Sequence, residues 1–366
     1  MSKQFTYSFI GLGLIGGSIA KALRHADPSC IIKAYDIDNT SLSLAHREGT
    51  ADETTTVLTD SFFDCDILFL CAPVSRNDAM LDTLKGKLHK NTILTDVGSV
   101  KQTTHHAIEE AGLGAQFIGG HPMAGSEKTG FANANPLLLE NAYYILTPTS
   151  QVAPEKTEQM KNLIHSIGAI PLVLSYEKHD YITAAVSHLP HIISACLVNL
   201  VKHADDEEGR MKQIAAGGFK DITRISSSSP VMWESICMTN TDNILKLLSD
   251  YIDDLSAVRH QLEMRSSDDL YALFDTAKEY RDSFTNAEHG PIKKIHSVFV
   301  DIPDIPGSLA RTAVILAEHN LSIKNIGIMH SREFQQGALR IEFYDEQTVA
   351  DAAKVLRENH YTIYEN

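Results

Sequence analysis

The sequence predicts an α/β chain built from three successive parts, and three observations carry that prediction. Residues 1–174 alternate short apolar segments with helical patterns, which is typical of βαβ units around a parallel sheet. From residue 175 to residue 288 the strand signal stops and long helical patterns take over. Residues 296–366 then show a βαββαβ rhythm of their own, which fits a ferredoxin-like sandwich.

Composition excludes several classes of function. A chain of 366 residues is too long for one ordinary core. The net charge of −15 argues against nucleic acid or an anionic membrane as a partner. The five cysteines form no CxxC pair, which favours free thiols in a reducing compartment. No unbroken apolar run approaches 18 residues, so we expect no membrane span, no signal peptide and a cytoplasmic location.

Six apolar segments predict the strands of the first part. The run Ile67–Leu70 contains no polar residue, which suits a strand buried on both faces. We therefore expect a parallel sheet flanked by helices. The six segments are Tyr7–Gly11, Ile31–Asp36, Ile67–Ala72, Thr92–Asp96, Tyr143–Thr147 and Ile170–Leu174.

A glycine-rich turn joins the first of these strands to the first helix. Gly11, Gly13 and Gly16 form the pattern G-x-G-x-x-G, and a helix is predicted over Ser18–Arg24. In this pattern the first glycine allows a tight turn, the second lets backbone approach a pyrophosphate, and the third lets helix and strand pack closely. The amino terminus of the helix faces the phosphates. The turn therefore predicts dinucleotide binding.

An aspartate ends the second predicted strand. Asp36 lies twenty residues after Gly16, where a carboxylate can accept hydrogen bonds from the adenosine ribose. Ile37 and Asp38 follow, with no arginine to hold a 2′-phosphate, so we expect NAD rather than NADP. Residues 1–174 are thus predicted to form a Rossmann-like domain. The residues expected to contact the cofactor are Gly11, Gly13, Leu14, Ile15, Gly16, Asp36, Ala72 and Pro73.

The segment 121–130 carries most of the candidate chemistry. It places His121, Ser126 and Glu127 among glycines, which let backbone approach a ligand. A histidine with an ordinary pKa of roughly 6.5 can act as a neutral base near pH 7. Ser99 follows the fourth predicted strand, and His121 follows another short apolar run. Both are expected at the carboxyl edge of the sheet, beside the nicotinamide.

The helical part adds further polar residues. His188 and His191 begin it, but no companion carboxylate or cysteine is apparent, so no metal is expected. One of the two is expected to be a capping or core histidine, and the sequence does not choose which. His105 and His106 are expected on an exposed helix face.

A helix beginning near Asp242 carries apolar residues at alternating spacings of four and three. This spacing is that of a short a/d seam. The seam fits packing within one subunit or between two, and we favour a homodimer. The seam residues are Ile244, Leu248, Tyr251, Leu255, Val258 and Leu262.

Several motifs, in this order along the chain, resemble the prephenate dehydrogenases of tyrosine biosynthesis over roughly residues 5–285. The resemblance implies oxidative decarboxylation of prephenate to 4-hydroxyphenylpyruvate and CO2, with NAD+ taking a hydride. The motifs are Gly-Leu-Gly-Leu-Ile-Gly-Gly-Ser, Asp-Val-Gly-Ser-Val-Lys, His-Pro-Met-Ala-Gly-Ser-Glu-Lys-Thr-Gly, Ser-His-Leu-Pro-His and Gly-Phe-Lys-Asp-Ile-Thr-Arg with Trp233.

The resemblance also implies roles for single residues. His121 would take the proton of the ring hydroxyl, and Ser99 would orient both the histidine and the hydroxyl. Arg224 matches the family's substrate-binding arginine, whose planar fork can hold a carboxylate. The remaining substrate contacts would come from Ser126, Glu127, His188 and His191.

Two alternatives stay open. An arogenate or broader cyclohexadienyl dehydrogenase would share these motifs, because arogenate differs from prephenate by an amino group in place of a keto group. A nicotinamide-binding sensor without catalysis is the second alternative, and the presence of Ser99, His121 and Arg224 argues against it.

The last part of the chain, residues 296–366, is similar to ACT domains, which bind regulatory amino acids. In such domains the ligand lies where the first strand turns into the first helix. L-tyrosine, the end product of the implied pathway, is the expected effector, and a purely structural role is the alternative. The residues expected at this regulatory site are Asp304, Ile305, Pro306, Gly307 and Asn325.

Overall fold

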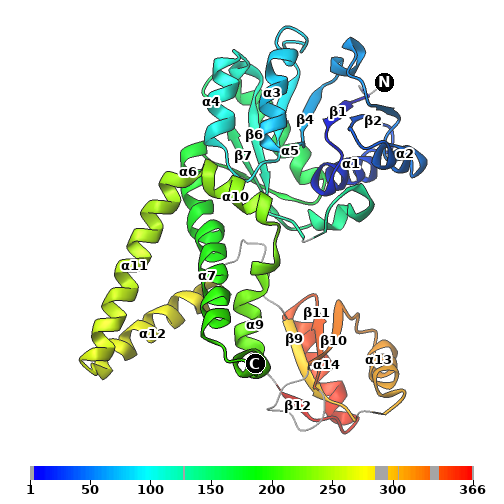
Figure 1. Ribbon diagram of the computed structural model, residues 1–366. Helices are drawn as coiled ribbons and strands as arrows, with labels where there is room; N and C mark the ends of the chain where they lie inside the picture. Colours follow the sequence, from blue (N-terminus) through cyan, green and yellow to red (C-terminus); the bar gives the residue numbers. More distant parts are fainter. Residues whose placement is uncertain (1–3, 127, 285–295, 304, 330–337, 365–366) are drawn as a thin grey trace. The chain divides into compact units, whose positions relative to one another are not determined.

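The computed structural model of the chain divides into two compact units, residues 1–266 and residues 267–366 (Figure 1). Glu127 and Asp304 lie outside the described residues, as do residues 288–291, where the sequence Glu-His-Gly-Pro predicts a linker. The expected domain boundaries remain predictions. The structure describes residues 4–126, 128–284, 296–303, 305–329 and 338–364.

A five-stranded parallel sheet forms the centre of the first unit. Its strand order is β3-β2-β1-β4-β5, so the order reverses between β1 and β4. Four of these strands were expected, whereas β3 was not, because it contains no apolar run. The strands are β1 (Thr6–Ile10), β2 (Ile31–Tyr35), β3 (Glu53–Thr55), β4 (Ile67–Leu70) and β5 (Ile93–Asp96).

Alternate side chains of this sheet belong to two separate apolar cores. Ile67 and Phe69 of β4 pack in the core shared with α1, α2 and α5, whereas Leu68 and Leu70 pack in the core shared with α3 and α4. The sheet is therefore covered on both faces, as its unbroken apolar strands predict. The helices are α1 (Leu14–Ala26), α2 (Asn39–Arg47), α3 (Val74–Leu84), α4 (Gln102–Glu110) and α5 (Pro154–Ser166).

Three further strands form a separate mixed sheet, which corrects the expectation of one parallel sheet. β6 (Ile118–Pro122) pairs antiparallel with β7 (Tyr143–Pro148), and β7 pairs parallel with β8 (Ile170–Val173). The antiparallel pair arises because no α-helix crosses between β6 and β7. A parallel bridge from Leu94 to Phe117 places β6 beside β5. The two strands therefore end at the same edge.

The rest of the first unit is helical. Ser229 caps α10 by accepting a hydrogen bond from the amide of Met232, and Pro230 opens that helix. One π-helical turn, Ala184–His188, joins α6 to α7 without a break. The helices are α6 (Tyr176–Thr183), α7 (Leu189–Ala204), α8 (Arg210–Ile214), α9 (Gly217–Thr223), α10 (Pro230–Thr239) and α11 (Thr241–Glu263).

The continuous helical run Tyr176–Ala204 is apolar enough to cross a membrane by length and composition alone, with a window of mean hydropathy 1.5. Polar residues divide the run, so the sequence shows no unbroken apolar segment there, and the absence of a membrane span stays a prediction. The run also contains His179, Asp180 and His188, which are buried. Their hydrogen bonds join the run to α4, β6 and α11.

The second unit begins with α12 (Ser267–Ser283) and contains a four-stranded antiparallel sheet of order β10-β11-β9-β12. Its elements follow the predicted order βαββαβ. Val298, Val300 and Leu339 form its core together with residues of the two helices. The elements are β9 (His296–Asp301), α13 (Ser308–Glu318), β10 (Asn325–Met329), β11 (Ala338–Phe343), α14 (Glu346–Glu358) and β12 (Ile363–Tyr364).

Candidate functional site

The candidate site lies at the carboxyl edge of the parallel sheet. β1, β4 and β5 run parallel, and β6 lies parallel to β5 at the Leu94–Phe117 bridge. Gly11 follows β1, Ser99 follows β5, and His121 is the fourth residue of β6. All three therefore lie at the edge where such sheets bind ligands.

The turn between β1 and α1 has no room for side chains at Gly11 and Gly16. Gly11 has φ of +92°, and a Cβ atom there would lie 2.6 Å from the backbone nitrogen of Ala72. A Cβ on Gly16 would lie 2.7 Å from the carbonyl oxygen of Gly11. Gly13 is the N-cap residue of α1, with open space at its Cβ position, so no side chain covers the amino terminus of the helix there. The turn and the helix terminus, including Leu14 and Ile15, therefore fit a pyrophosphate group.

Asp36 lies just beyond the end of β2, beside this turn. Its Oδ2 atom accepts a hydrogen bond of 2.6 Å from the amide of Leu12, and its Oδ1 atom accepts one of 2.8 Å from the amide of Asp38. Ala72 and Pro73 lie between β4 and α3, and the Ala72 carbonyl accepts a hydrogen bond from Asn77. The edge thus places a carboxylate acceptor beside the glycine turn, which is the arrangement expected for a dinucleotide.

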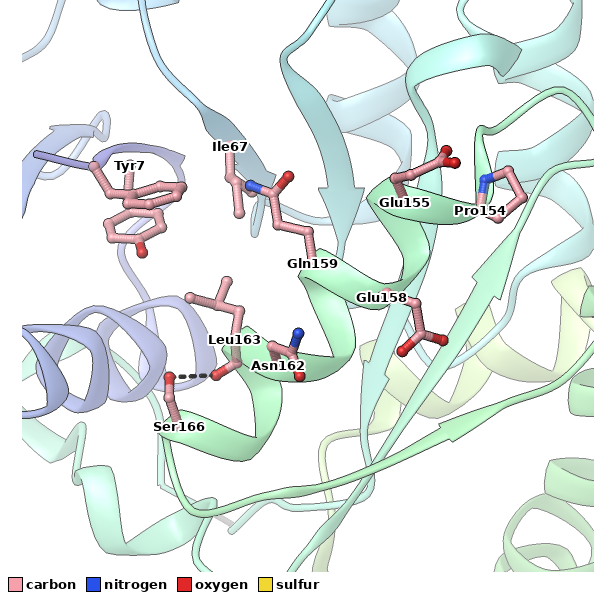
Figure 2. A pocket seen from close by; sticks show the side chains of 10 residues that line it. Tyr7, Ile67, Pro154, Glu155, Glu158, Gln159, Asn162, Leu163 and Ser166 are labelled. Carbon is pink, nitrogen blue, oxygen red and sulfur yellow. Dashed lines mark hydrogen bonds between the residues drawn. The ribbon is translucent and has the colours of Figure 1, made fainter. Parts of the chain in front are cut away.

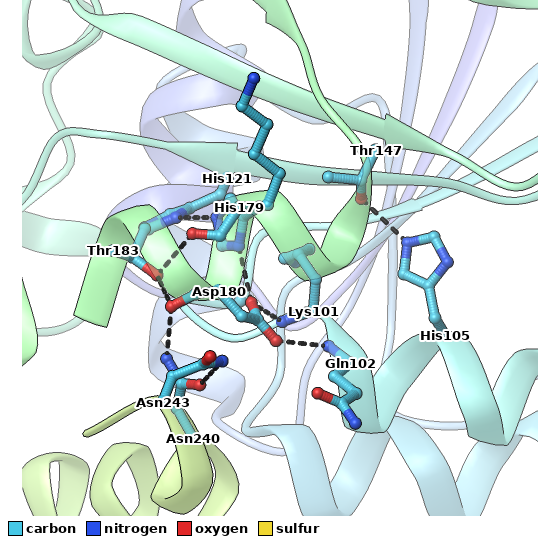
Figure 3. A network of polar contacts seen from close by, with 12 residues as sticks. Lys101, Gln102, His105, His121, Thr147, His179, Asp180, Thr183, Asn240 and Asn243 are labelled. Atoms are coloured by element: carbon cyan, nitrogen blue, oxygen red, sulfur yellow. Dashed lines mark hydrogen bonds and ion pairs between the residues drawn. The ribbon is translucent and has the colours of Figure 1, made fainter. Parts of the chain in front are cut away.

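His121 bonds to a second histidine rather than to Ser99. Its Nδ1 atom lies 2.8 Å from Nε2 of His179, and Nδ1 of His179 lies 2.7 Å from Oδ1 of Asp180 (Figure 3). His179 and Asp180 are fully buried, whereas His121 is half-buried. The hydrogen bond at Nδ1 of His121 is therefore made by His179, and the orienting role expected of Ser99 stays a prediction.

Asp180 also caps helix α4. Its Oδ1 atom accepts a hydrogen bond of 2.8 Å from the amide of Lys101, and its Oδ2 atom accepts one of 2.8 Å from the amide of Gln102. The residue at the N-cap of α4, Lys101, provides no side-chain cap of its own. A carboxylate at a helix N-terminus is favoured by the helix dipole. Asp180 thus joins the helical region to the edge of the sheet.

A buried ion pair holds the loop of Ser99 against β6. Nζ of Lys101 lies 2.5 Å from Oδ2 of Asp96 and donates a hydrogen bond of 2.8 Å to the carbonyl of Gly120. The amide of Gly120 donates to Oδ1 of Asp96 at 3.1 Å. Ser99 is half-buried in the loop that this pair closes. The backbone next to His121 is therefore fixed from two sides.

The pKa of His121 lies well below its ordinary value, which differs from the ordinary value expected from the sequence. Burial is the main cause, and electrostatic repulsion between protonated His121 and the protonated forms of His179, Lys101 and His188 lowers the pKa further. Burial likewise lowers the pKa of His179, although the hydrogen bond to Asp180 opposes the shift. Both rings are therefore neutral at pH 7.

The structure distinguishes His188 from His191. His188 is buried, its Nδ1 atom accepts a hydrogen bond of 3.1 Å from Nδ2 of Asn240, and burial lowers its pKa to about 4. It is the core histidine of the pair. His191 is half-buried, stacks on Trp233 with 3.7 Å between ring centroids, and donates to the carbonyl of Ser187.

Arg224 lies near His191. Burial is the main cause of the lowered pKa of His191, and the positive charge of Arg224 lowers it further. Arg224 itself is exposed, at the carboxyl end of α9. An exposed guanidinium beside a stacked histidine can bind a carboxylate.

The structure places Ser126 at the surface and His105 in the interior. Ser126 is exposed, and its hydroxyl accepts a hydrogen bond from the amide of Lys128. His105 is fully buried rather than exposed, which corrects our prediction. Its face of α4 packs against β7 and α6, where Nε2 lies 2.9 Å from the hydroxyl of Thr147 and the ring stacks on Tyr176.

Sequence reasoning missed His179, Asp180 and Asn240. Asn240 donates to the carbonyl of Asp180 at 2.8 Å as well as to His188, so it joins α11 to the same cluster. The sequence carried no strong signal for the first two, because His179 and Asp180 follow Glu177 and Lys178 at the polar start of α6. Such residues need partners when they are buried.

Among the described residues, no group of three His, Cys, Asp or Glu side chains could hold a metal ion.

A groove of about 710 Å³ lies beside α5 and is lined by Tyr7, Ile67 and Leu163, among others (Figure 2). Tyr7 and Ile67 are near the amino ends of their strands, so the groove lies away from the candidate site.

The expected regulatory residues lie on two segments of the second unit. Ile305, Pro306 and Gly307 are exposed in the turn between β9 and α13, and Gly307 caps α13 with φ of +90°. Asn325 is the first residue of the edge strand β10, and its side chain accepts a hydrogen bond from the amide of Ile326.

Comparisons with known proteins point to one family. Residues 19–172 match the family model "Prephenate dehydrogenase, nucleotide-binding domain", and residues 175–276 match "Prephenate dehydrogenase, dimerization domain". A prephenate dehydrogenase of Bacillus subtilis is 38% identical, over 98% of this chain and 98% of its own length.

Two solved structures are similar over more than three quarters of the chain. The prephenate dehydrogenase of Aquifex aeolicus, in complex with hydroxyphenyl propionate and NAD+, has a TM-score of 0.72 and is 32% identical, covering 78% of this chain and 99% of its own. The arogenate dehydrogenase of Synechocystis has a TM-score of 0.68 and is 28% identical, covering 76% of this chain and 99% of its own.

Proposed function

The chain belongs to the prephenate dehydrogenase family, and we propose that the cluster around His121 converts prephenate to 4-hydroxyphenylpyruvate and CO2 with NAD+ as oxidant. The observation that carries the proposal is the position of His121. A half-buried, neutral imidazole lies at the sheet edge that also holds the glycine turn. Proton removal, hydride loss and decarboxylation need a base and an oriented cofactor, and they need no metal.

His121 acts as the general base in this proposal. It takes the proton of the ring hydroxyl at Nε2, because its Nδ1 atom already bonds to His179. NAD+, when bound, accepts the hydride from the carbon that carries the hydroxyl. The ring carboxylate then leaves as CO2, its bonding electrons aromatise the ring, and the proton held on His121 returns to the phenolate oxygen.

The remaining residues would bind and orient the substrate. Arg224 binds one substrate carboxylate, and His191, fixed by its stack on Trp233, provides a polar contact beside it. Ser99 contacts the ring hydroxyl from the loop that the Asp96–Lys101 pair closes. The remaining proposed contacts come from Ser126 and Glu127, whereas His188 is the core histidine of the pair.

A substrate panel tests the proposal. We expect NADH from prephenate with NAD+, and much slower turnover with NADP+. Arogenate in place of prephenate tests the second candidate, which the similarity to the Synechocystis arogenate dehydrogenase favours. Failure to turn over either substrate would leave the sensor alternative.

We also propose that the helical region forms a homodimer. Val186 and Leu200 of the run Tyr176–Ala204 are 63% and 64% exposed, and Leu255 and Leu262 of α11 are 50% and 58% exposed. Ile244, at the start of the same seam, is only 5% exposed. The seam thus packs within the subunit at one end and stays open at the other. A second copy would cover exposed apolar surface of this kind, and a molar mass near twice 40.4 kDa would support it.

Finally, we propose that the second unit binds L-tyrosine and regulates the enzyme. Its βαββαβ order matches that of the regulatory domains it resembles. The exposed turn Ile305–Gly307 provides the proposed contacts, together with Asp304 and Asn325.

A further inference from the structure

We propose that Asp180, acting through His179, fixes the tautomer of His121 so that Nε2 of His121 carries a free lone pair toward the substrate. This inference rests on the proposed function, in which His121 is the base. His179 and Asp180 would be positioning residues, because they touch the base and not the reacting atoms.

The direction of the hydrogen bonds follows from Asp180. An ionised carboxylate only accepts hydrogen bonds, and Oδ1 of Asp180 lies 2.7 Å from Nδ1 of His179. That nitrogen therefore carries the hydrogen. A neutral imidazole has only one N–H group, so Nε2 of His179 is an acceptor.

The same reasoning extends to His121. Its Nδ1 atom lies 2.8 Å from Nε2 of His179, which accepts, so Nδ1 of His121 must donate. Since His121 is also neutral, its Nε2 atom keeps the lone pair that a base requires. The opposite tautomer would set the lone pair of His179 Nδ1 against a carboxylate oxygen inside a fully buried contact.

The carboxylate at the start of this chain is held in place. Asp180 receives the amides of Lys101 and Gln102, one on each oxygen, so it cannot turn its Oδ1 atom away from His179. Lys101 also bonds to the carbonyl of Gly120, the residue before His121. The base and its positioning pair are thus both fixed to the same loop. A buried aspartate plays this orienting part toward the histidine of serine proteases.

The variant Asp180→Asn tests the inference directly. Its amide nitrogen must lie either at the Oδ2 position, where it faces the amide of Gln102, or at the Oδ1 position, where it faces the amide of Lys101 and would donate to Nδ1 of His179. In the second arrangement His179 donates from Nε2 to His121, and the hydrogen of His121 moves to Nε2. We expect kcat to fall by roughly 10²–10⁴-fold, with KM for prephenate and NAD+ changed by no more than about threefold.

Two further variants separate positioning from folding. His179→Phe removes the link to His121 but leaves the two backbone hydrogen bonds of Asp180 in place, and it should also lower kcat. His105→Phe is the matched control, because His105 is equally buried on the neighbouring helix but bonds to Thr147 instead. Its kcat should stay within about twofold of the wild type.

Nitrogen-15 NMR of histidine-labelled wild-type protein without substrate reads the tautomer itself. We expect Nε2 of His121 unprotonated in the wild type and protonated in Asp180→Asn. A wild type with Nε2 protonated would overturn the inference even if every variant misfolds. A lower kcat in Asp180→Asn together with an unchanged kcat in His179→Phe would also overturn the inference, because Asp180 would then act only as the cap of α4. Failure of the proposed function would differ, since the wild type would not oxidise prephenate.

Discussion

The carboxylate of Asp36 accepts a hydrogen bond of 2.6 Å from the backbone amide of Leu12, which ties the end of β2 to the glycine turn. The second carboxylate oxygen bonds to the amide of Asp38. Both interactions hold the carboxylate beside the glycine turn, where we propose that the adenosine ribose of the cofactor binds. Asp36→Ala should therefore lower the ratio of kcat/KM with NAD+ to kcat/KM with NADP+, chiefly by weakening the binding of NAD+.

Measurement of kcat/KM for both cofactors checks this prediction. Asp38→Ala is a suitable control, because it removes a nearby carboxylate that caps α2 through the amides of Thr40 and Ser41. The control should leave the cofactor ratio unchanged. A wild type that prefers NADP+ would contradict the role given to Asp36.

Arg224→Ala should act mainly on KM for prephenate. The proposed contact to a carboxylate is already made in the ground state, and hydrogen bonds to charged groups contribute about 1.5–3 kcal/mol. KM should rise by roughly 10- to 150-fold with a smaller change in kcat. Arg210→Ala is the control, since Arg210 is exposed on α8 and pairs with Asp206. An unchanged KM in Arg224→Ala would remove this residue from the substrate site.

The lowered pKa of His121 predicts the acid limb of the pH profile. A base must be neutral to accept a proton, and a lower pKa extends the neutral form to lower pH. Burial, with repulsion from the protonated forms of His179, Lys101 and His188, lowers this pKa. Wild-type kcat/KM for prephenate should therefore stay level as pH falls from 8 through 6.5, and decline only below that. Half-maximal kcat/KM at or above pH 6.5 would show a base with an ordinary pKa of roughly 6.5.

Removal of the four-stranded sheet of the second unit tests the regulatory proposal. A chain ending at Gly290 keeps every proposed catalytic residue and α12, so it should oxidise prephenate but lose inhibition by L-tyrosine. In the full chain, Asn325→Ala should weaken that inhibition without changing kcat. The expected coupling is about 1–3 kcal/mol. Equal inhibition of the shortened and full chains would mean that tyrosine acts at the active site and that the second unit is structural.

Much of the fold could be predicted because the pattern is local. Unbroken apolar runs such as Ile67–Leu70 become buried parallel strands, and the glycine turn opens α1. The short strand β3 lacks apolar residues and gives no such signal. The antiparallel pairing of β6 with β7 depends on how the long connection between them folds, which no local periodicity records.

The site could be predicted only in part, for a related reason. His121 stands in a distinctive motif, whereas its partner His179 is 58 residues away in an ordinary helical pattern. Asp180 meets Lys101 across 79 residues. The burial of His105 likewise depends on packing against Thr147 and Tyr176, so the sequence predicted an exposed residue there. Contacts between distant segments decide which polar residues work together.

The measurement that tests the central claim most directly is steady-state NADH formation from prephenate by the wild type and by His121→Asn. Asparagine is close in size and can still bond to His179, but it cannot accept a proton at the position of Nε2. The account predicts NADH formation by the wild type and a kcat lower by roughly 10²–10⁴-fold in the variant, with KM little changed. A variant with near-normal kcat would contradict the assignment of His121 as the base.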